Sequence, residues 1–220
     1  MVLLHRAASE KRLRPKESKV VIQGFGNVGS HTALYLEELG YCIVGLSDVT
    51  GGVYAEKGID IKKATLHISE VGSLVGLPQC EAISNEDLLK LPCDILIPAA
   101  LEATITCDNA NTVQAQLIVE AANIPLTHGA DKELRSRGVT IVPDLLANVG
   151  GVLASYYEWV QNLQEFPWIR ETVLRRLEER LSEVYAKVSH LAKEKQVDLR
   201  TAAYEIAISR VNRAISLRGF

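Results

Sequence analysis

The sequence lacks a strong excess of charge of either sign and any long apolar run. Its 220 residues include 27 acidic and 24 basic side chains, which leave a net charge of −3. This balance gives no electrostatic basis for binding nucleic acid or an anionic membrane. No stretch approaches the roughly 20 apolar residues that cross a bilayer. The first residues form too short an apolar segment for a signal peptide. We therefore expect a protein that acts apart from nucleic acids and membranes.

Cysteine is also scarce, with four residues that lie far apart: Cys42, Cys80, Cys93 and Cys107. They form no CxxC pair and have no histidine at metal-ligand spacing, so no metal site is predicted. Cys42 and Cys93 adjoin apolar runs and are expected to be buried as small hydrophobic side chains. This cysteine usage is typical of the reducing cytoplasm.

Short apolar runs recur along the first two thirds of the chain, at 19–23, 42–46, 94–98, 117–120 and 140–143. Helical stretches such as 30–39 and 131–137 lie between them. Strands that alternate with helices predict an α/β fold, a Rossmann-type doubly wound, mainly parallel sheet. The glycine-rich segment 51–54, followed by Gly58, is interpreted as a turn-rich insertion.

Beyond Pro143 the pattern becomes helical. Apolar residues repeat every three or four positions from Ile169 to Leu191, which predicts an amphipathic helix with one buried stripe. Asp198 is a candidate N-cap for another helix, which carries Leu199, Ala202, Ile206 and Val211 on one side. Both stripes are interpreted as core packing, so additional C-terminal α-helices are expected to complete the fold.

A glycine-rich motif, GxGxxG, spans residues 24–29 between the first apolar run and a helical stretch. Gly24 would permit a tight turn, Gly26 would let a pyrophosphate approach the backbone, and Gly29 would let helix and strand pack closely. Asp48 ends the next strand about 20 residues on, where an acid is expected to bind the adenosine ribose hydroxyls. Because its carboxylate would repel a 2′-phosphate and residues 49–53 contain no Arg or Lys, NAD is favoured, with NADP the alternative if Lys57 or residues elsewhere reach the site.

These patterns divide the chain into three parts. Residues 1–18 are interpreted as a partial N-terminal helix with a basic connector. Residues 19–150 are interpreted as a dinucleotide-binding domain, and residues 151–220 as C-terminal helices that complete it.

Five long blocks carry a family resemblance, at residues 20–29, 93–100, 142–152, 155–164 and 198–204. In these blocks the chain resembles the glutamate/leucine/phenylalanine/valine dehydrogenases, most of all the glutamate enzymes. The resemblance implies a part in the NAD(P)-dependent, reversible oxidative deamination of glutamate to 2-oxoglutarate and ammonium. Ser155 matches the serine that binds the substrate side-chain carboxylate, and a hydroxyl donor suits that group better than an apolar side chain.

The resemblance also implies a set of cofactor-binding residues. These are Gly24, Phe25, Gly26, Asn27, Val28 and Gly29 of the motif, Asp48, Ala99 and Ala100 beside the nicotinamide ribose, Asn123 at the nicotinamide edge, and Asn148 near cofactor and substrate.

One departure from the family pattern falls beside Asn123. Ala121 and Ile124 stand where the family usually has glycines. If those positions need a positive φ or leave room for the nicotinamide, the added bulk would weaken binding. The other interpretation is a tolerated change in loop packing.

The catalytic lysine and aspartate of the family lie on a substrate domain that precedes this one, and the motifs of that domain are absent here. The resemblance therefore implies no catalytic residue in this chain and no turnover by the chain alone. Glutamate or 2-oxoglutarate would be partners once a substrate domain is supplied. The last helices would be exposed, or covered by that domain or by a second copy in a homo-oligomer.

Two alternatives to a dehydrogenase half stay open. The first is a non-catalytic, regulatory dinucleotide-binding module that assembles with a full-length dehydrogenase. The second is a different Rossmann oxidoreductase with its own acid–base residue, for which His128 is the only histidine considered.

Overall fold

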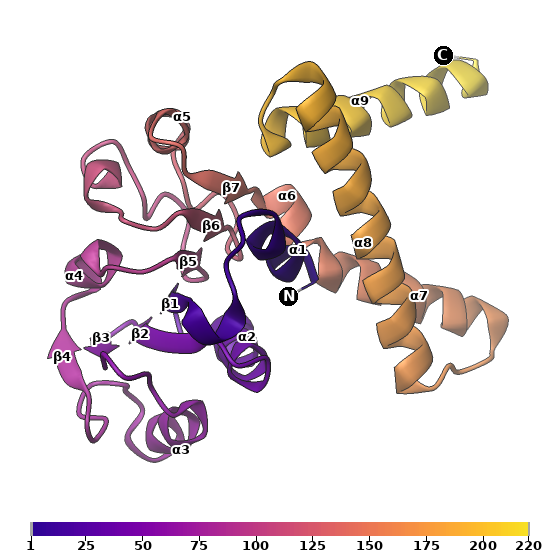
Figure 1. Cartoon of the computed structure of the whole chain (residues 1–220). Coiled ribbons are helices and arrows are strands. Elements are labelled where there is room, and N and C mark those ends of the chain that lie inside the picture. Colours follow the sequence, from indigo (N-terminus) through magenta and orange to yellow (C-terminus); the bar gives the residue numbers. More distant parts are fainter. Residues whose placement is uncertain (1, 220) are drawn as a thin grey trace.

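The computed structural model describes residues 2–219, in which a seven-stranded sheet is flanked by helices (Figure 1). The strands run in the order β4-β3-β2-β1-β5-β6-β7. Their bounds are β1 Lys19–Gln23, β2 Cys42–Asp48, β3 Gly51–Tyr54, β4 Glu81–Ile83, β5 Ile95–Pro98, β6 Leu117–Val119 and β7 Thr140–Val142. The neighbouring pairs β2–β1, β1–β5, β5–β6 and β6–β7 are parallel. At one edge of the sheet, β3 pairs antiparallel with both β2 and β4. The predicted α/β, doubly wound and mainly parallel sheet is confirmed.

The helices alternate with the strands and then follow them. Their bounds are α1 Val2–Glu10, η1 Pro15–Glu17, α2 Asn27–Glu38, α3 Ile61–Val71, α4 Asn85–Lys90, η2 Ala110–Thr112, α5 His128–Ser136, α6 Asp144–Ala147, α7 Val149–Gln164, α8 Arg170–Lys195 and α9 Leu199–Arg218. No helix within residues 2–219 is long and apolar enough to cross a membrane.

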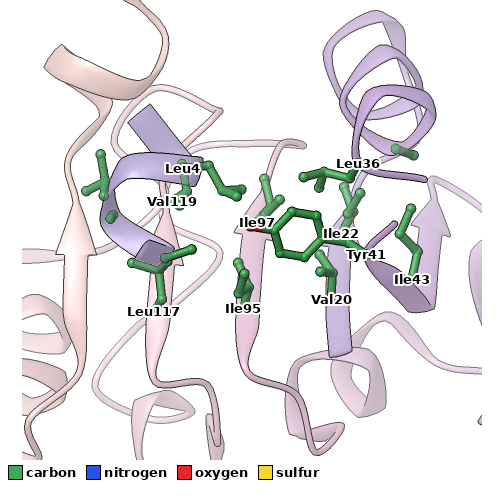
Figure 2. Packing of buried hydrophobic residues seen from close by; sticks show 14 of the residues in the cluster. Leu4, Val20, Ile22, Leu36, Tyr41, Ile43, Ile95, Ile97, Leu117 and Val119 are labelled. Carbon is green, nitrogen blue, oxygen red and sulfur yellow. The ribbon is translucent and has the colours of Figure 1, made fainter. Parts of the chain in front are cut away.

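The central strand β1 shows why its sequence is continuously apolar. Val20 and Ile22 pack into the core on the face that α1, α2 and α8 cover, and Val21 packs into the core on the opposite face. Successive strand residues point to opposite faces, so a strand covered on both sides needs apolar residues throughout. Figure 2 shows the first of these cores, with Leu4 of α1 packed above Leu117 and Val119.

The segment 51–54 corrects one prediction. It is the antiparallel strand β3 and not a turn-rich insertion. Its residues are mostly buried, and a Cβ on Gly52 would lie 3.0 Å from the Ile83 side chain of β4. Glycine stands in this strand because neighbouring chains approach it closely.

The C-terminal helices confirm the predicted N-cap and correct part of the burial prediction. The Asp198 carboxylate accepts a hydrogen bond from the Thr201 amide at the start of α9. Tyr185, Val188 and Ala192 of α8 are buried, but Ile169 and Val211 at the far ends of the two stripes are exposed. The stripes therefore pack into the core only where α8 and the first turn of α9 lie against the rest of the fold, and α9 then extends away from the sheet (Figure 1).

The three predicted parts of the chain remain predictions. Met1 and Phe220, which they include, lie outside the described residues.

The predicted burial of two cysteines is also corrected. Cys42 and Cys93 are half-buried at the margin of the second core, rather than buried in it. Burial, together with the nearby Asp94 carboxylate, raises the pKa of the Cys93 thiol to about 12. Its thiolate is therefore scarce at neutral pH, and the thiol acts as a small apolar group.

Candidate functional site

The candidate site lies at the carboxyl edge of the parallel strands, where the strand order reverses direction around β1. The chain runs from β1 to β2 on one side, and β5 lies on the other. In open α/β sheets ligands bind in the crevice outside such a switch point. Most of the predicted site residues lie at or just after the ends of β1, β2, β5 and β6, whereas Asn148 and Ser155 lie beyond β7, at the start of α7 and within it.

Two glycines of the motif are required by the fold itself. Gly24 has φ +95°, and a Cβ there would lie 2.9 Å from the backbone of Ala100. A Cβ on Gly29 would lie 1.8 Å from the Gly24 carbonyl oxygen, so helix α2 could not start so close to the strand with any other residue. Gly24 therefore makes the turn and Gly29 permits close packing of helix and strand.

Gly26 is different because nothing in the described fold requires a glycine at that position. Its φ of −78° suits any residue, and a Cβ would meet no atom within 4 Å. Gly26 is the N-cap of α2 and offers no side-chain acceptor to the first amides of that helix. A helix N-terminus with unhindered amides attracts anions. The open position at Gly26 fits a pyrophosphate approaching those amides.

The other motif residues differ in exposure. Phe25 is buried in the first core, whereas Asn27 and Val28 are exposed in the first turn of α2. The Asn27 carbonyl accepts a hydrogen bond from His31 Nδ1 at 2.8 Å. The Asn27 side chain is thus exposed, while its backbone belongs to the helix.

Asp48 ends β2 directly beside the glycine turn, since Gln23 pairs with Ser47 and the Ser47 hydroxyl accepts the Gly24 amide at 3.3 Å. The Asp48 carboxylate accepts hydrogen bonds from the Thr50 amide at 2.7 Å and from the Leu74 amide at 2.6 Å. Burial raises the pKa of Asp48, but these hydrogen bonds outweigh that effect and lower it. Asp48 is therefore ionised at neutral pH and held in place.

This anchoring role of Asp48 was not expected from the sequence. The Thr50 hydroxyl also donates to the carboxylate, so three of its roughly four acceptor positions are used within the chain. The Asp-x-Thr spacing is a local signal of such a turn.

A groove of about 580 Å³ brings five of the predicted residues together: Val28, Ala99, Ala100, Asn123 and Asn148. The groove is lined from the first turn of α2, the loops after β5 and β6, and the first turn of α7. Asn148 Nδ2 donates a hydrogen bond to Asn123 Oδ1 at 2.7 Å, which joins two of these elements. No histidine lines the groove, and His128 is exposed at the start of α5. That geometry gives no support to an acid–base role for His128.

Ser155 does not line the groove. It is exposed on α7, one helical turn beyond Gly151 and Val152, which do line it. Residues three or four apart share a helix face, so Ser155 lies on the groove side of α7.

The loop from residue 120 to residue 125, here called the Asn123 loop, contains the departure from the family pattern. Ile124 has φ +46°, a left-handed conformation that β-branched residues rarely adopt. Its amide donates to Asp144 Oδ2 at 2.9 Å, and its carbonyl accepts from the Ala103 amide at 2.9 Å. Ala121 is not among the described residues with a positive φ. The first of the two conditions under which a glycine would matter, a positive φ, is therefore met at Ile124 and not at Ala121.

The described fold and its glycine turn together define a Rossmann-type α/β protein. The sequence profile described as "Glutamate/Leucine/Phenylalanine/Valine dehydrogenase" matches residues 1–219. The chain belongs to this family.

Individual relatives agree with the profile. The chain is 42% identical over all its 220 residues to an NAD-specific glutamate dehydrogenase of Staphylococcus aureus, and covers 53% of that protein. It is 45% identical over 204 residues, 92% of its length, to an NADP-specific glutamate dehydrogenase of Saccharolobus shibatae, and covers 48% of it. The crystal structure of a hetero-hexameric, leucine-bound glutamate dehydrogenase from Thermus thermophilus matches all of the chain with a TM-score of 0.94 at 37% identity, and the chain covers 52% of it. The chain spans about half the length of the relatives it matches.

Proposed function

We propose that this chain is the dinucleotide-binding half of a glutamate dehydrogenase. In this proposal residues 19–150 bind the cofactor, and residues 151–220 complete the domain. A substrate domain supplies the catalytic lysine and aspartate, and together the two halves convert glutamate reversibly to 2-oxoglutarate and ammonium. When bound, the nicotinamide accepts the hydride from the substrate. Ser155, exposed on the groove side of α7, is proposed to contact the substrate carboxylate.

The observation that carries this proposal is the open position at Gly26. The fold requires glycine at positions 24 and 29 but not at position 26, because a Cβ there would touch nothing. A ligand that approaches the α2 amides would explain the missing side chain. The groove is lined by Val28, two residues further along the chain in the first turn of α2, and by Asn123.

Asp48 supports NAD over NADP. Its carboxylate is ionised and cannot turn away, because Thr50 and Leu74 hold both of its oxygens. A fixed negative charge at this point repels a 2′-phosphate, and residues 49–53 contain no Arg or Lys to compensate.

The first test is calorimetric titration of the chain with NAD and with NADP, repeated on Gly26→Val. We expect micromolar NAD binding, weaker NADP binding, and a loss of at least about tenfold in NAD affinity, ~1.4 kcal/mol, in the variant. The variant should still fold, because the new side chain meets no atom of the fold, and it should lose at most about 1 kcal/mol of stability, because valine is a poorer N-cap than glycine. If a folded chain binds neither nucleotide, the proposal is wrong.

The second test is turnover. Glutamate-dependent NADH formation should be absent with the chain alone and should appear when a substrate domain is added as a separate polypeptide. Failure to restore turnover with a folded partner and a cofactor-loaded chain would contradict the enzymatic role.

The strained Ile124 favours one second candidate, a regulatory dinucleotide-binding module that does not itself catalyse. That module would bind NAD, give no turnover with a substrate domain, and alter the activity of a full-length dehydrogenase with which it co-assembles. Co-purification with such an enzyme separates the two candidates.

Association with other subunits belongs to both candidates. Large apolar side chains stay exposed on α7, on the loop that follows it and on α9, among them Trp159, Phe166, Ile208 and Leu217. A surface of this kind fits a substrate domain or a second copy of the chain. The four free cysteines support a cytoplasmic location.

A further inference from the structure

A group of buried charges lies directly beneath the Asn123 loop. Glu120, the first residue after β6, is fully buried. Its Oε1 lies 2.6 Å from Arg200 Nη2, and its Oε2 accepts a hydrogen bond from the Asp144 amide at 2.8 Å. A buried carboxylate without a partner costs several kcal/mol. Burial raises the pKa of Glu120, and Arg200 and the Asp144 amide offset part of the cost of charging it there.

Arg200 extends these contacts to two more carboxylates. Its Nε lies 3.0 Å from Asp131 Oδ2, and its Nη1 lies 3.3 Å from Asp144 Oδ1. The second oxygen of Asp144 accepts the Ile124 amide at 2.9 Å. A continuous path of polar contacts therefore runs from the first turn of α9, through Asp144, to the backbone of the Asn123 loop.

This path ends at Ile124, whose backbone conformation is strained. Ile124 adopts a left-handed conformation that is unfavourable for a β-branched residue, and such conformations persist only where surrounding contacts hold them. The Asp144 contact fixes its amide. Asn123, the preceding residue, is paired with Asn148 at the groove. A change in the position of Asp144 would therefore move the loop that carries Asn123.

We propose that Arg200 is a positioning residue, which fixes the Asn123 loop through Glu120 and Asp144 at the end of the groove that receives the nicotinamide. This inference rests on the proposed function. It assigns to the C-terminal helix α9 a part in the cofactor site, although no residue of α9 lines the groove.

The structure offers a matched control for Arg200. Arg135 belongs to the same group of charges and lies 2.7 Å from Asp131 and 2.7 Å from Asp198, but the contacts of its side chain do not reach Glu120 or Asp144. Arg135→Gln removes a comparable ion pair near the start of α9 and leaves the path to Ile124 intact. If these charges had a purely structural role, Arg200→Gln and Arg135→Gln would have the same effect on ligand binding.

The experiment compares NAD with ADP-ribose, which has the same phosphates and adenosine but no nicotinamide ring. Binding of both is measured by calorimetry on the full chain, on Arg200→Gln and on Arg135→Gln. We expect Arg200→Gln to lower the ratio of NAD affinity to ADP-ribose affinity by about five- to tenfold, and Arg135→Gln to leave it unchanged. Hydrogen exchange of the Ile124 amide should become faster in Arg200→Gln only.

Three results would overturn the proposal: an unchanged ratio in a folded Arg200→Gln that binds ADP-ribose, equal effects in the two variants, or unchanged Ile124 exchange. If the original chain binds neither ligand, the proposed function fails, while the exchange measurement still tests the loop contact. If Arg200→Gln does not fold, Arg200→Lys is measured instead. Its ammonium can pair with Glu120 but cannot span all three carboxylates, so a smaller fall in the same ratio, about threefold, is expected.

Discussion

Replacement of Ile124 by glycine should make the protein more stable. Ile124 has φ +46°, and the residue is 61% exposed, so most of its side chain makes no packing contribution. Its backbone hydrogen bonds to Asp144 and Ala103 do not depend on the side chain. The change therefore relieves backbone strain and keeps the contacts that hold the loop.

The size of the gain follows from three contributions. A β-branched residue in the left-handed region carries about 2 to 3 kcal/mol of strain, which glycine avoids. Glycine loses about 0.5 to 1 kcal/mol more backbone entropy on folding than a residue with a side chain. Losing the buried part of the isoleucine side chain costs at most about 1 kcal/mol, since its full burial is worth ~3 kcal/mol. The net stabilisation is about 1 kcal/mol, or ~2 to 4 °C in melting temperature for a chain of this size.

Thermal unfolding followed by circular dichroism, together with urea titration, measures this change. Ile124→Ala is the matched control, because it removes the same packing but keeps a Cβ in the left-handed region, and it should gain much less than the glycine variant. A glycine variant that is less stable than the original chain, or no more stable than the alanine variant, would refute the strain argument.

Two further predictions concern the glycine turn and the start of α9. Gly29→Ala should destabilise the fold by about 3 kcal/mol, because its Cβ would lie 1.8 Å from the Gly24 carbonyl oxygen. Gly151→Ala, whose Cβ would meet nothing within 4 Å, should not destabilise the fold in the same urea titration and should gain up to about 1 kcal/mol, because alanine is the better helix former. Asp198→Ala should cost about 1 to 2 kcal/mol at pH 7, because it removes an N-cap and a contact with Arg135. Burial raises the pKa of Asp198, but hydrogen bonds from the first turn of α9 and the Arg135 charge outweigh it and lower the pKa. A lowered folded-state pKa means that this stabilisation is present above the ordinary aspartate pKa and is lost as pH falls through the folded value. The difference between Asp198→Ala and the original chain should therefore shrink toward pH 3, and an equal difference at both pH values would contradict this origin.

The parts of the fold that could be predicted from the sequence depend on neighbouring residues. The apolar runs gave the five parallel strands because each lies between two covered faces. The glycine motif and the N-cap at Asp198 are also local, since each acts on residues within one helical turn. The match of long blocks to one family added the groove residues Ala99, Asn123 and Asn148, which no periodicity indicates.

The parts that were missed depend on residues distant in the sequence. Gly51 and Gly52 indicated a turn, but β3 is a strand because Ile83 of β4 packs against it from 31 positions away along the chain. The helical sequence around Arg200 gives no sign that its side chain is partly buried. Its contact with Glu120 joins residues 80 positions apart in the chain. One local sign was present, because Glu120 directly follows an apolar strand and a buried carboxylate requires a partner.

The position of the Asn123 loop distinguishes the two candidate functions, the dehydrogenase half and the regulatory module. The phosphates would bind at the glycine turn, whose geometry depends on Gly24 and Gly29 and not on the loop. Dinucleotide affinity could therefore persist while strain at Ile124 or a loss of the Arg200 contacts displaces the loop beside the nicotinamide. Catalysis depends on the nicotinamide position far more than binding does, since a displacement of about 1 Å can cost about a hundredfold in rate. A chain that binds NAD and ADP-ribose equally well would fit a regulatory module, and a chain whose NAD affinity depends on Arg200 would fit the dehydrogenase half.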